Sequence, residues 1–345
     1  MKDHPTVFEA LQAQGISRRR FLKFCAVTAS SLALSGTAAR AFAQTLGSAT
    51  RPSVIWMSFQ QCTGCSESLL RSSARPLPLV GAPDSNVSSD SVENLILDVI
   101  SLDYHEALQV AAGQQAEQAR LDAMQANSGK YVLIVDGSIP TGENEWWMAV
   151  AGKSALSTLA EAVSGAAVVI ALGTCATFGG LPGAYPNPSK AMGVGALMDA
   201  GLIPTRTFVN LSGCPPVPEV ITGALAMYLM SLGPNGAPLV LDELKRPRVF
   251  YGKTVHESCS RIGHYKDGNY ANSFDDAGAR QGWCLYMLGC RGPSTYNACS
   301  LVKWNEGTSF PMLSGHGCLG CAEPGFWDKT RAPDGTLTGG FYTPV

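Results

Sequence analysis

The chain has 345 residues, of which 46% are hydrophobic and only 15% carry a charge, and its formal net charge at pH 7 is −2. Soluble proteins average about 25% charged residues, so the low fraction indicates that a partner covers part of the surface. The acidic balance argues against nucleic-acid binding, and a chain of this length is expected to fold as two domains.

The N-terminus has the pattern of an export signal. Residues 17–23, SRRRFLK, place paired arginines before an Ala- and Ser-rich run, which resembles a twin-arginine signal over 1–43. A transmembrane anchor is the alternative, but the apolar core over 24–34 is shorter than the ~20 residues that span a bilayer. We expect export to the periplasm in the folded state, by a route that often carries proteins with cofactors already inserted. Membrane attachment is expected to be peripheral, through partners, with no transmembrane anchor of its own.

Short apolar runs alternate with helical stretches from about residue 53 to 235. Strands are predicted at 53–59, 94–102, 130–139, 166–174 and 206–213, and helices at 106–126 and 154–165. Continuous apolar strands between helices predict a parallel sheet covered on both faces, an α/β domain of the flavodoxin-like kind. Neither a GxGxxG nor a Walker lysine loop occurs in it. The Pro- and Ser-rich stretch at 75–90 is predicted to be a long surface loop.

Gly and Pro cluster over residues 233–250, where the alternation of strands and helices stops. This composition predicts a boundary between the flavodoxin-like domain, 50–235, and a C-terminal domain, 248–345. The C-terminal part has six cysteines and few periodic segments. Its stability is therefore expected to come from metal centres more than from a large apolar core, with little regular secondary structure.

Ten of the eleven cysteines follow the predicted export signal. An even number of cysteines in an exported protein first suggests disulfides. Taken alone, the pair Cys62 and Cys65 fits a redox disulfide, half of a zinc site or part of an iron-sulfur cluster. Export in the folded state, and the position of several cysteines directly after strands, favour metal ligation.

Cys62, Cys65, Cys175 and Cys214 each follow a predicted strand. Loops that leave the carboxyl ends of parallel strands meet at one edge of a sheet, so these thiolates are expected to form one four-cysteine site. Zinc would use the same four ligands, and the expected geometry does not exclude it. Three glycines let the backbone approach a bulky inorganic group here: Gly64, Gly173 and Gly213.

The C-terminal part supplies two further groups of ligands. An imidazole is a competent iron ligand beside three thiolates, and His264 is a nearby competitor of His256 for that role. The second group consists of His256, Cys259, Cys284 and Cys290, and the third of Cys299, Cys318 and Cys321. Three thiolates fit a cluster that lacks one iron corner. The division leaves no thiol after residue 43 for a disulfide.

The other histidines and the paired tryptophans are expected to be structural. His105 is expected at the surface or at an interface, and His316 is expected to orient the loop before Cys318. Trp146 and Trp147 are expected to be packing groups.

The ordered set of motifs resembles the small subunit of an exported nickel-iron hydrogenase. The motifs are SRRRFLK, CTGCSES, GTCATFGG, SGCPPVPEVITG, HESC, WCLYMLGCRGPSTYNAC and WNEGTSFPMLSGHGCLGC, and they cover nearly all of the chain after the signal. The resemblance implies an electron-transfer subunit of a heterodimeric enzyme that oxidises or evolves H2. It also implies that the nickel-iron centre lies in a separate large subunit, with no catalytic residue in this chain.

The resemblance assigns the three groups to three iron-sulfur clusters by position. A proximal 4Fe-4S cluster would be held by Cys62, Cys65, Cys175 and Cys214. A medial 3Fe-4S cluster would be held by Cys299, Cys318 and Cys321, with Pro311 where a fourth ligand would otherwise lie. A distal 4Fe-4S cluster would be held by His256, Cys259, Cys284 and Cys290. Electrons would pass in this order to an external acceptor, either a soluble carrier or a membrane carrier such as a cytochrome b.

Oxygen-tolerant members of this family carry two extra cysteines near the proximal cluster, and this chain has Gly64 and Gly180 at those places. The resemblance therefore implies an ordinary cubane and an enzyme that oxygen inhibits. Glu67 lies where a carboxylate could face the large subunit. Two alternatives remain open from the residues: a cluster subunit of another oxidoreductase, such as a quinone-reducing complex, and a zinc-stabilised binding protein.

Overall fold

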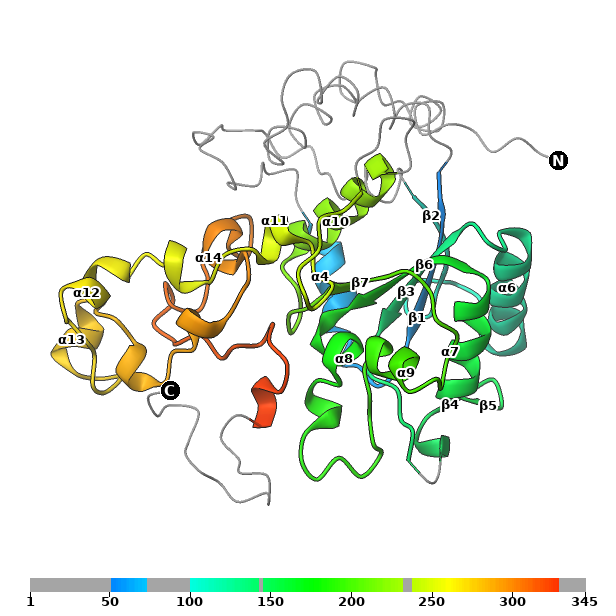
Figure 1. Cartoon of the computed structure of the whole chain (residues 1–345), viewed down its shortest axis with the longest axis horizontal. Coiled ribbons are helices and arrows are strands. Elements are labelled where there is room, and N and C mark those ends of the chain that lie inside the picture. Colours follow the sequence, from blue (N-terminus) through cyan, green and yellow to red (C-terminus); the bar gives the residue numbers. More distant parts are fainter. Residues whose placement is uncertain (1–50, 73–99, 143–144, 232–237, 329–345) are drawn as a thin grey trace, which may run out of the picture.

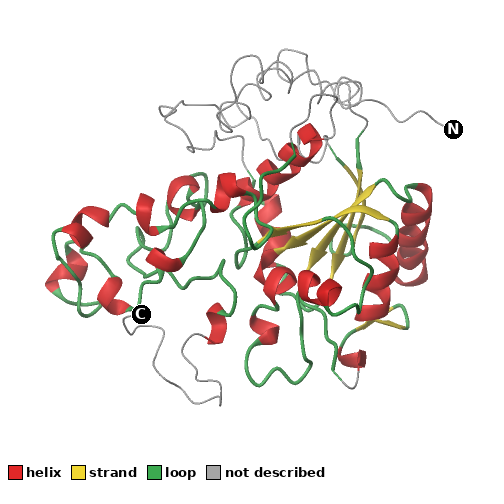
Figure 2. Cartoon of the chain, viewed as in Figure 1, coloured by secondary structure: helices red, strands yellow, loops and turns green. Residues whose placement is uncertain are grey.

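The structure is a computed structural model that describes residues 51–72, 100–142, 145–231 and 238–328. A sheet flanked by helices forms one part of the molecule, and short helices and loops after residue 247 form the other, beside it along the long axis (Figure 1, Figure 2). The export motif and the predicted loop at 75–90 lie outside the described residues. No helix in the described ranges has both the length and the apolar character needed to cross a bilayer.

The sheet has five strands, all paired in parallel. Its strands are β1 (Ser53–Ser58), β2 (Ser101–His105), β3 (Tyr131–Asp136), β6 (Ala166–Leu172) and β7 (Phe208–Leu211). They lie in the order β2-β1-β3-β6-β7, which is the doubly wound order of flavodoxin-like folds. The predicted fold class is confirmed.

Helices cover both faces of the sheet, and successive residues of each strand point to opposite faces. Val132 and Ile134 of β3 pack with α4 (Gly64–Leu70) and α10 (Pro218–Ser231) in one core. Leu133 and Val135 belong to the core on the other face. That core is covered by α6 (Gly113–Ala126), α7 (Ala155–Ser164), α8 (Gly173–Phe178) and α9 (Val194–Asp199).

The helix predicted at 106–126 starts later than expected. The amides of Leu108 and Gln109 donate to the carbonyl oxygen of His105, at 3.1 and 3.0 Å, and form a turn directly after β2. Ala112 is extended, and α6 begins at Gly113. The apolar pattern of the segment continues through the turn, so helical periodicity alone predicted a helix start at residue 106 that precedes the observed start.

The C-terminal part has little regular structure, as predicted. Its helices are short: α11 (Arg248–Tyr251), α12 (Ile262–Lys266), α13 (Ala277–Arg280) and α14 (Cys299–Val302). Single 3₁₀ turns occur at η3 (His256–Ser258), η4 (Tyr286–Leu288), η5 (Gly292–Ser294) and η6 (Phe326–Asp328). The remaining short elements lie in the sheet part: η1 (Glu145–Trp147), β4 (Ala149–Val150), β5 (Lys153–Ser154) and η2 (Leu181–Gly183). A small core around Leu285, Phe310 and Met312 includes three of the predicted ligand cysteines.

The two parts share one apolar core. Phe250, Tyr251 and Val302 pack into the same cluster of buried side chains as the strands β1, β3 and β6. The Tyr251 hydroxyl donates to the carbonyl oxygen of Ser212, directly after β7, at 2.7 Å. The C-terminal part is therefore anchored on the edge of the sheet where β6 and β7 end.

Candidate metal centres

Four cysteines converge at the carboxyl edge of the sheet. Cys62 lies between β1 and α4, Cys65 lies in α4, Cys175 lies in α8 directly after β6, and Cys214 follows β7. The thiol of Cys175 is close enough to those of Cys62 and Cys214 to interact electrostatically, and Cys65 interacts in the same way with Cys62 and Cys175. The structure brings together the four residues of the first predicted group.

Glycines leave space beside the sulfur atoms of this first group. A Cβ atom added to Gly173, which has a φ of +82°, would lie 2.5 Å from Cys65 Sγ. At Gly180, with a φ of +58°, it would lie 2.4 Å from Cys175 Sγ. Cβ atoms do not approach other heavy atoms this closely, so a side chain at either position would force the sulfur atom to move, and at Gly180 also the backbone of Cys175. The space kept free beside the thiols fits a bulky inorganic group.

A buried carboxyl group beside Cys65 was not identified from the sequence. Asp136 ends β3 and is almost fully buried, and no hydrogen-bond partner for its Oδ2 atom lies within the described residues. Burial raises the pKa of Asp136 to about 6. Burial, and then the neighbouring Asp136, raise the pKa of the Cys65 thiol well above its usual value. The signal in the sequence was a single acidic residue at the end of an otherwise apolar strand.

Three cysteines meet where the C-terminal part joins the sheet. Cys299 begins α14, and its amide donates to Asn297 Oδ1 at 2.8 Å. The thiols of Cys299, Cys318 and Cys321 interact electrostatically with one another. Burial raises the pKa of each to about 12. Trp304 and Cys299 pack against the same cluster of buried side chains. This set is the third predicted group.

The remaining predicted ligands line one cavity in the C-terminal part. The lining of this cavity includes His256, Cys259, Cys284 and Cys290. His264 is not among the residues that line it. The ring of His256 packs edge-on against Tyr265, with 4.5 Å between the ring centroids. The structure therefore brings together the second predicted group, with the histidine that the sequence analysis selected.

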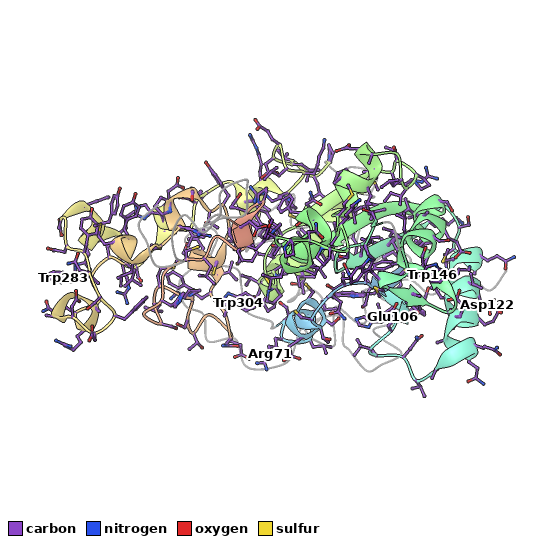
Figure 3. The ribbon with its side chains drawn as sticks, turned by 90° about the horizontal axis from the view of Figure 1, so that it is seen from below. Arg71, Glu106, Asp122, Trp146, Trp283 and Trp304 are labelled. Atoms are coloured by element: carbon purple, nitrogen blue, oxygen red, sulfur yellow. The ribbon has the colours of Figure 1, made fainter. Side chains whose placement is uncertain are left out.

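The three groups adjoin one another in a row. The hydroxyl of Thr174, the neighbour of Cys175 in the first group, donates to the backbone carbonyl oxygen of Cys321 in the third group. The amide of Cys318, also in the third group, donates to Cys290 Sγ in the second group at 3.2 Å. Figure 3 shows this order along the molecule: Trp304 lies between Arg71, at the end of α4, and Trp283, at the far end of the C-terminal part.

The donor chemistry of these groups fits iron-sulfur clusters. Thiolates are the ligands of such clusters, and imidazole can replace thiolate. None of the ten cysteines in the described residues forms a disulfide. Burial holds the thiol of Cys175 at a pKa of about 12, so it stays protonated at neutral pH unless a metal takes the place of the proton. Within the described ranges, no three His, Cys, Asp or Glu side chains converge in the manner of ligands to a single metal ion.

His105 does not lie where the sequence analysis expected it. The residue is buried at the end of β2, with its Nε2 atom 3.2 Å from Ser66 Oγ and its ring 4.8 Å from that of Trp56 between centroids. The expected surface position is wrong, because α4 and β1 cover this end of β2. Burial lowers the pKa of His105 to about 4, so its imidazole is neutral at pH 7.

Trp146 and Trp147 are not packing groups, because both are more than half exposed, at 56% and 53%. They lie in η1, which contacts β5 and α7 of the sheet part. Glu67 is exposed and forms an ion pair with Arg71 at 2.6 Å. His316 bonds through Nδ1 to the carbonyl oxygen of Gly317 at 2.8 Å, directly before Cys318.

Two family models match the chain. The model of the C-terminal region of the NiFe/NiFeSe hydrogenase small subunit matches residues 251–333. The model of the NADH ubiquinone oxidoreductase 20 Kd subunit matches residues 85–228. The second model therefore covers the sheet part from residue 85 onward, and the first covers the C-terminal part with its two thiol-rich groups.

Relatives of known name match along most of the chain. The uptake hydrogenase small subunit of Afipia carboxidovorans is 41% identical over 94% of this chain and 82% of its own length. The periplasmic [NiFe] hydrogenase small subunit 1 of Nitratidesulfovibrio vulgaris is 44% identical over 93% of this chain and 94% of its own. The solved [NiFeSe] hydrogenase of Desulfovibrio vulgaris Hildenborough superposes with a TM-score of 0.71 and 32% identity, covering 86% of this chain and 98% of that one. With identities of this size over nearly the whole length, the chain belongs to the family of nickel-iron hydrogenase small subunits.

Proposed function

We propose that the chain is the electron-transfer small subunit of a nickel-iron hydrogenase, an enzyme that oxidises or evolves H2. The observation that carries the proposal is the row of three ligand groups from the sheet edge into the C-terminal part, joined by the hydrogen bonds of Thr174 with Cys321 and of Cys318 with Cys290. The names of relatives over nearly the whole chain support it. The nickel-iron centre is assigned to the large subunit of the heterodimer.

The three groups are proposed to hold three clusters. The 50–235 part holds the proximal 4Fe-4S cluster, and the 248–345 part holds the other two. The ligands are Cys62, Cys65, Cys175 and Cys214 for the proximal cluster, Cys299, Cys318 and Cys321 for the medial 3Fe-4S cluster, and His256, Cys259, Cys284 and Cys290 for the distal 4Fe-4S cluster. When bound, such clusters gain and lose single electrons.

The protein itself supplies positions, burial and hydrogen bonds. The glycines at 173 and 180 keep space beside two ligand sulfur atoms. The amides of Gly320 and Arg261 donate to Cys318 Sγ and Cys259 Sγ, each at 3.4 Å, which stabilises the thiolate form. The cysteines of the second group and Cys318 of the third are buried, whereas Cys62 of the first group is exposed. Exposure to water is one of the factors that set a cluster's potential.

The partners are proposed to bind at opposite ends of the row. Exposed tryptophans are enriched in protein interfaces, and Trp146 and Trp147 on the sheet part, together with the low charge of the chain, support a surface covered by the large subunit. His256 of the second group is only partly buried, which supports transfer to a soluble or membrane-bound acceptor there. The periplasmic relatives and the SRRRFLK motif support export by the twin-arginine route and a peripheral place on the membrane through partners.

Metal analysis of the purified heterodimer tests the proposal. We expect about eleven iron atoms per small subunit, with nickel in the partner, and an EPR signal of a 3Fe-4S cluster in the oxidised protein. Zinc in place of iron would refute the assignment. His256→Gln is expected to alter the distal signal, whereas the matched variant His264→Gln, outside the cavity, leaves it unchanged.

A cluster subunit of a quinone-reducing complex is the second candidate, favoured by the family model that matches 85–228. That model does not extend over the C-terminal groups, whereas the hydrogenase relatives match them. A partner subunit without nickel would support the second candidate against the first.

An ordinary four-cysteine proximal cubane, and inhibition by oxygen, are proposed from Gly64 and Gly180. Neither position carries a thiol, and a side chain at Gly180 would collide with Cys175 Sγ in this backbone conformation. Hydrogen oxidation that continues under air, measured on the purified heterodimer, would contradict this part of the proposal.

A further inference from the structure

One buried hydroxyl joins the backbone of the first and third ligand groups. Thr174 directly precedes the proximal ligand Cys175 in α8 and is only 1% exposed. Its Oγ1 atom accepts a hydrogen bond at 2.9 Å from the amide of Gly213, which directly precedes the proximal ligand Cys214. The same hydroxyl donates to the carbonyl oxygen of the medial ligand Cys321. A single side-chain atom therefore connects three ligand segments that are far apart in the sequence.

The directions of these bonds follow from the groups involved. The Gly213 amide can only donate and the Cys321 carbonyl can only accept, so the hydroxyl of Thr174 uses its one proton toward Cys321. The amide of Thr174 also donates to the carbonyl oxygen of Gly213 at 2.8 Å. Threonine is branched at Cβ, which restricts rotation of the side chain about χ1. The loop after β7 and the segment of Cys321 are thus both held against α8 in fixed directions.

Side-chain hydrogen bonds hold the medial ligand Cys321 in place. The residue lies in a turn, outside the helices and strands. Thr174 bonds to its carbonyl oxygen, and Arg246 Nη1 donates to the carbonyl oxygen of the next residue, Ala322, at 3.1 Å. The thiol of Cys321 is close enough to that of Cys214 to interact with it electrostatically. The separation of the first and third groups is therefore set at this point of the fold.

A second threonine in the same helix lacks this connecting geometry. Thr177 is also buried, at 4% exposure, and lies one turn after Thr174 in α8. Its hydroxyl donates to the carbonyl oxygen of Thr174 at 3.3 Å, a bond that stays within the helix. The two residues share their type, helix and burial, and they differ in whether the hydroxyl reaches other ligand segments.

We propose that Thr174 is a positioning residue for electron transfer, whose hydroxyl fixes the separation and orientation of the proximal and medial clusters. Transfer between two redox centres becomes slower as their separation grows, so the position of each ligand segment matters. Thr174→Val keeps the shape of the side chain but leaves the buried Gly213 amide and Cys321 carbonyl without this partner, which favours a shift of both segments. The inference rests on the proposed function, since it requires clusters at both groups.

EPR of the purified heterodimer, reduced with H2, tests this role. Both clusters then have unpaired electrons, and their magnetic interaction splits the proximal signal by an amount that depends on separation and orientation. Thr174→Val is expected to shift this splitting by more than the line width. Thr174→Ser keeps the hydroxyl and is expected to retain the splitting. Thr177→Val is the matched control and is also expected to retain it.

Hydrogen exchange of the same heterodimers shows whether the bond to Gly213 is lost. The Gly213 amide is expected to exchange on the order of tenfold faster in Thr174→Val than in the unmodified protein. In Thr174→Ser and Thr177→Val it is expected to exchange at nearly the unmodified rate. Total iron is expected to be the same in all the variants, because each ligand cysteine is still present.

Three results would overturn the proposal. The first is an unchanged splitting in Thr174→Val, and the second is an equal shift in Thr174→Ser or Thr177→Val, which would show that the hydroxyl of Thr174 is not the positioning group. Thr174→Ala is the second variant without a hydroxyl if the valine variant does not assemble. The third is failure of both to assemble while the serine variant does so, which would make the hydroxyl a requirement of folding. Absence of iron-sulfur signals from the unmodified heterodimer would instead refute the proposed function.

Discussion

Gly173 and Gly201 both have a left-handed backbone, with φ values of +82° and +69°, but their surroundings differ. Alanine at either position introduces backbone strain of about 1–2 kcal/mol. At Gly173 the new Cβ would also lie 2.5 Å from Cys65 Sγ, whereas nothing lies within 4 Å at Gly201. We expect Gly173→Ala to lose proximal iron and Gly201→Ala to keep it, measured as iron and acid-labile sulfide per heterodimer. Equal iron content in the two variants would rule out a cradle at Gly173.

Glu106 gives the stability of the chain a dependence on pH. Burial raises its pKa to about 7, from a usual value of 4.5. The folded chain therefore holds a proton that the unfolded chain has released. The stability linked to this group is complete below about pH 4.5 and is lost as the pH rises through about 7. Glu106 is labelled in Figure 3, on the sheet part of the molecule.

We expect Glu106→Gln to remove this loss of stability. The free energy of unfolding of the variant should exceed that of the unmodified protein by on the order of 1 kcal/mol at about pH 8, after allowance for solvent screening. At about pH 5 the two should differ little. Unfolding midpoints of the heterodimer at the two pH values measure the difference. Glu67→Gln, at an exposed carboxylate, is the control. A gain of the same size at both pH values would show that burial of the charge is not the cause.

At the scale of elements, α6 and α7 are joined by a buried ion pair network. Arg120 is buried in α6, and its Nη2 atom lies 2.6 Å from Glu117 and 3.0 Å from Glu161 of α7. Lys153 reaches Glu161 at 3.1 Å from a position that is 39% exposed. Removal of the buried partner leaves two carboxylates facing each other, whereas removal of the exposed partner leaves the network in place.

We expect Arg120→Ala to lower the free energy of unfolding by about 3 kcal/mol, and Lys153→Ala by less than about 1 kcal/mol. Denaturant unfolding of the heterodimer measures both values. Iron content should remain unchanged in both variants, because α6 lies at the end of the molecule opposite the C-terminal part, as the positions of Asp122 and Trp283 in Figure 3 show. Equal losses in the two variants would contradict the role of the buried arginine.

For the whole molecule, the shared core predicts that the sheet and the C-terminal part unfold together. Phe250 is buried in that core, and its neighbour Val249 is 37% exposed. Phe250→Ala is expected to lower the free energy of unfolding by about 3–5 kcal/mol, and Val249→Ala by about 0.5 kcal/mol or less. Both variants are expected to unfold in one cooperative transition. Calorimetry of the heterodimer tests this. Two separate transitions, with only one shifted by Phe250→Ala, would show that the parts fold independently.

The parts of the fold that sequence reasoning predicted are those encoded by neighbouring residues. Apolar runs such as 130–139 predicted strands, because a strand covered on both faces needs apolar residues on both. Ser154 caps α7 by accepting a hydrogen bond from the Ser157 amide at 3.3 Å, within the predicted helix 154–165. The start of α6 was misplaced, because the turn after His105 depends on backbone bonds that periodicity does not record.

The sequence by itself determined the class of the sheet and the family, because each depends on residue type and spacing along the chain. The division of the cysteines into three ligand groups stays a prediction. Only the tertiary structure decided that Asp136 lies buried beside Cys65, that His105 is covered and that Trp147 is not. Burial and electrostatic contact depend on which distant segments pack against a residue, and neither composition nor spacing records that.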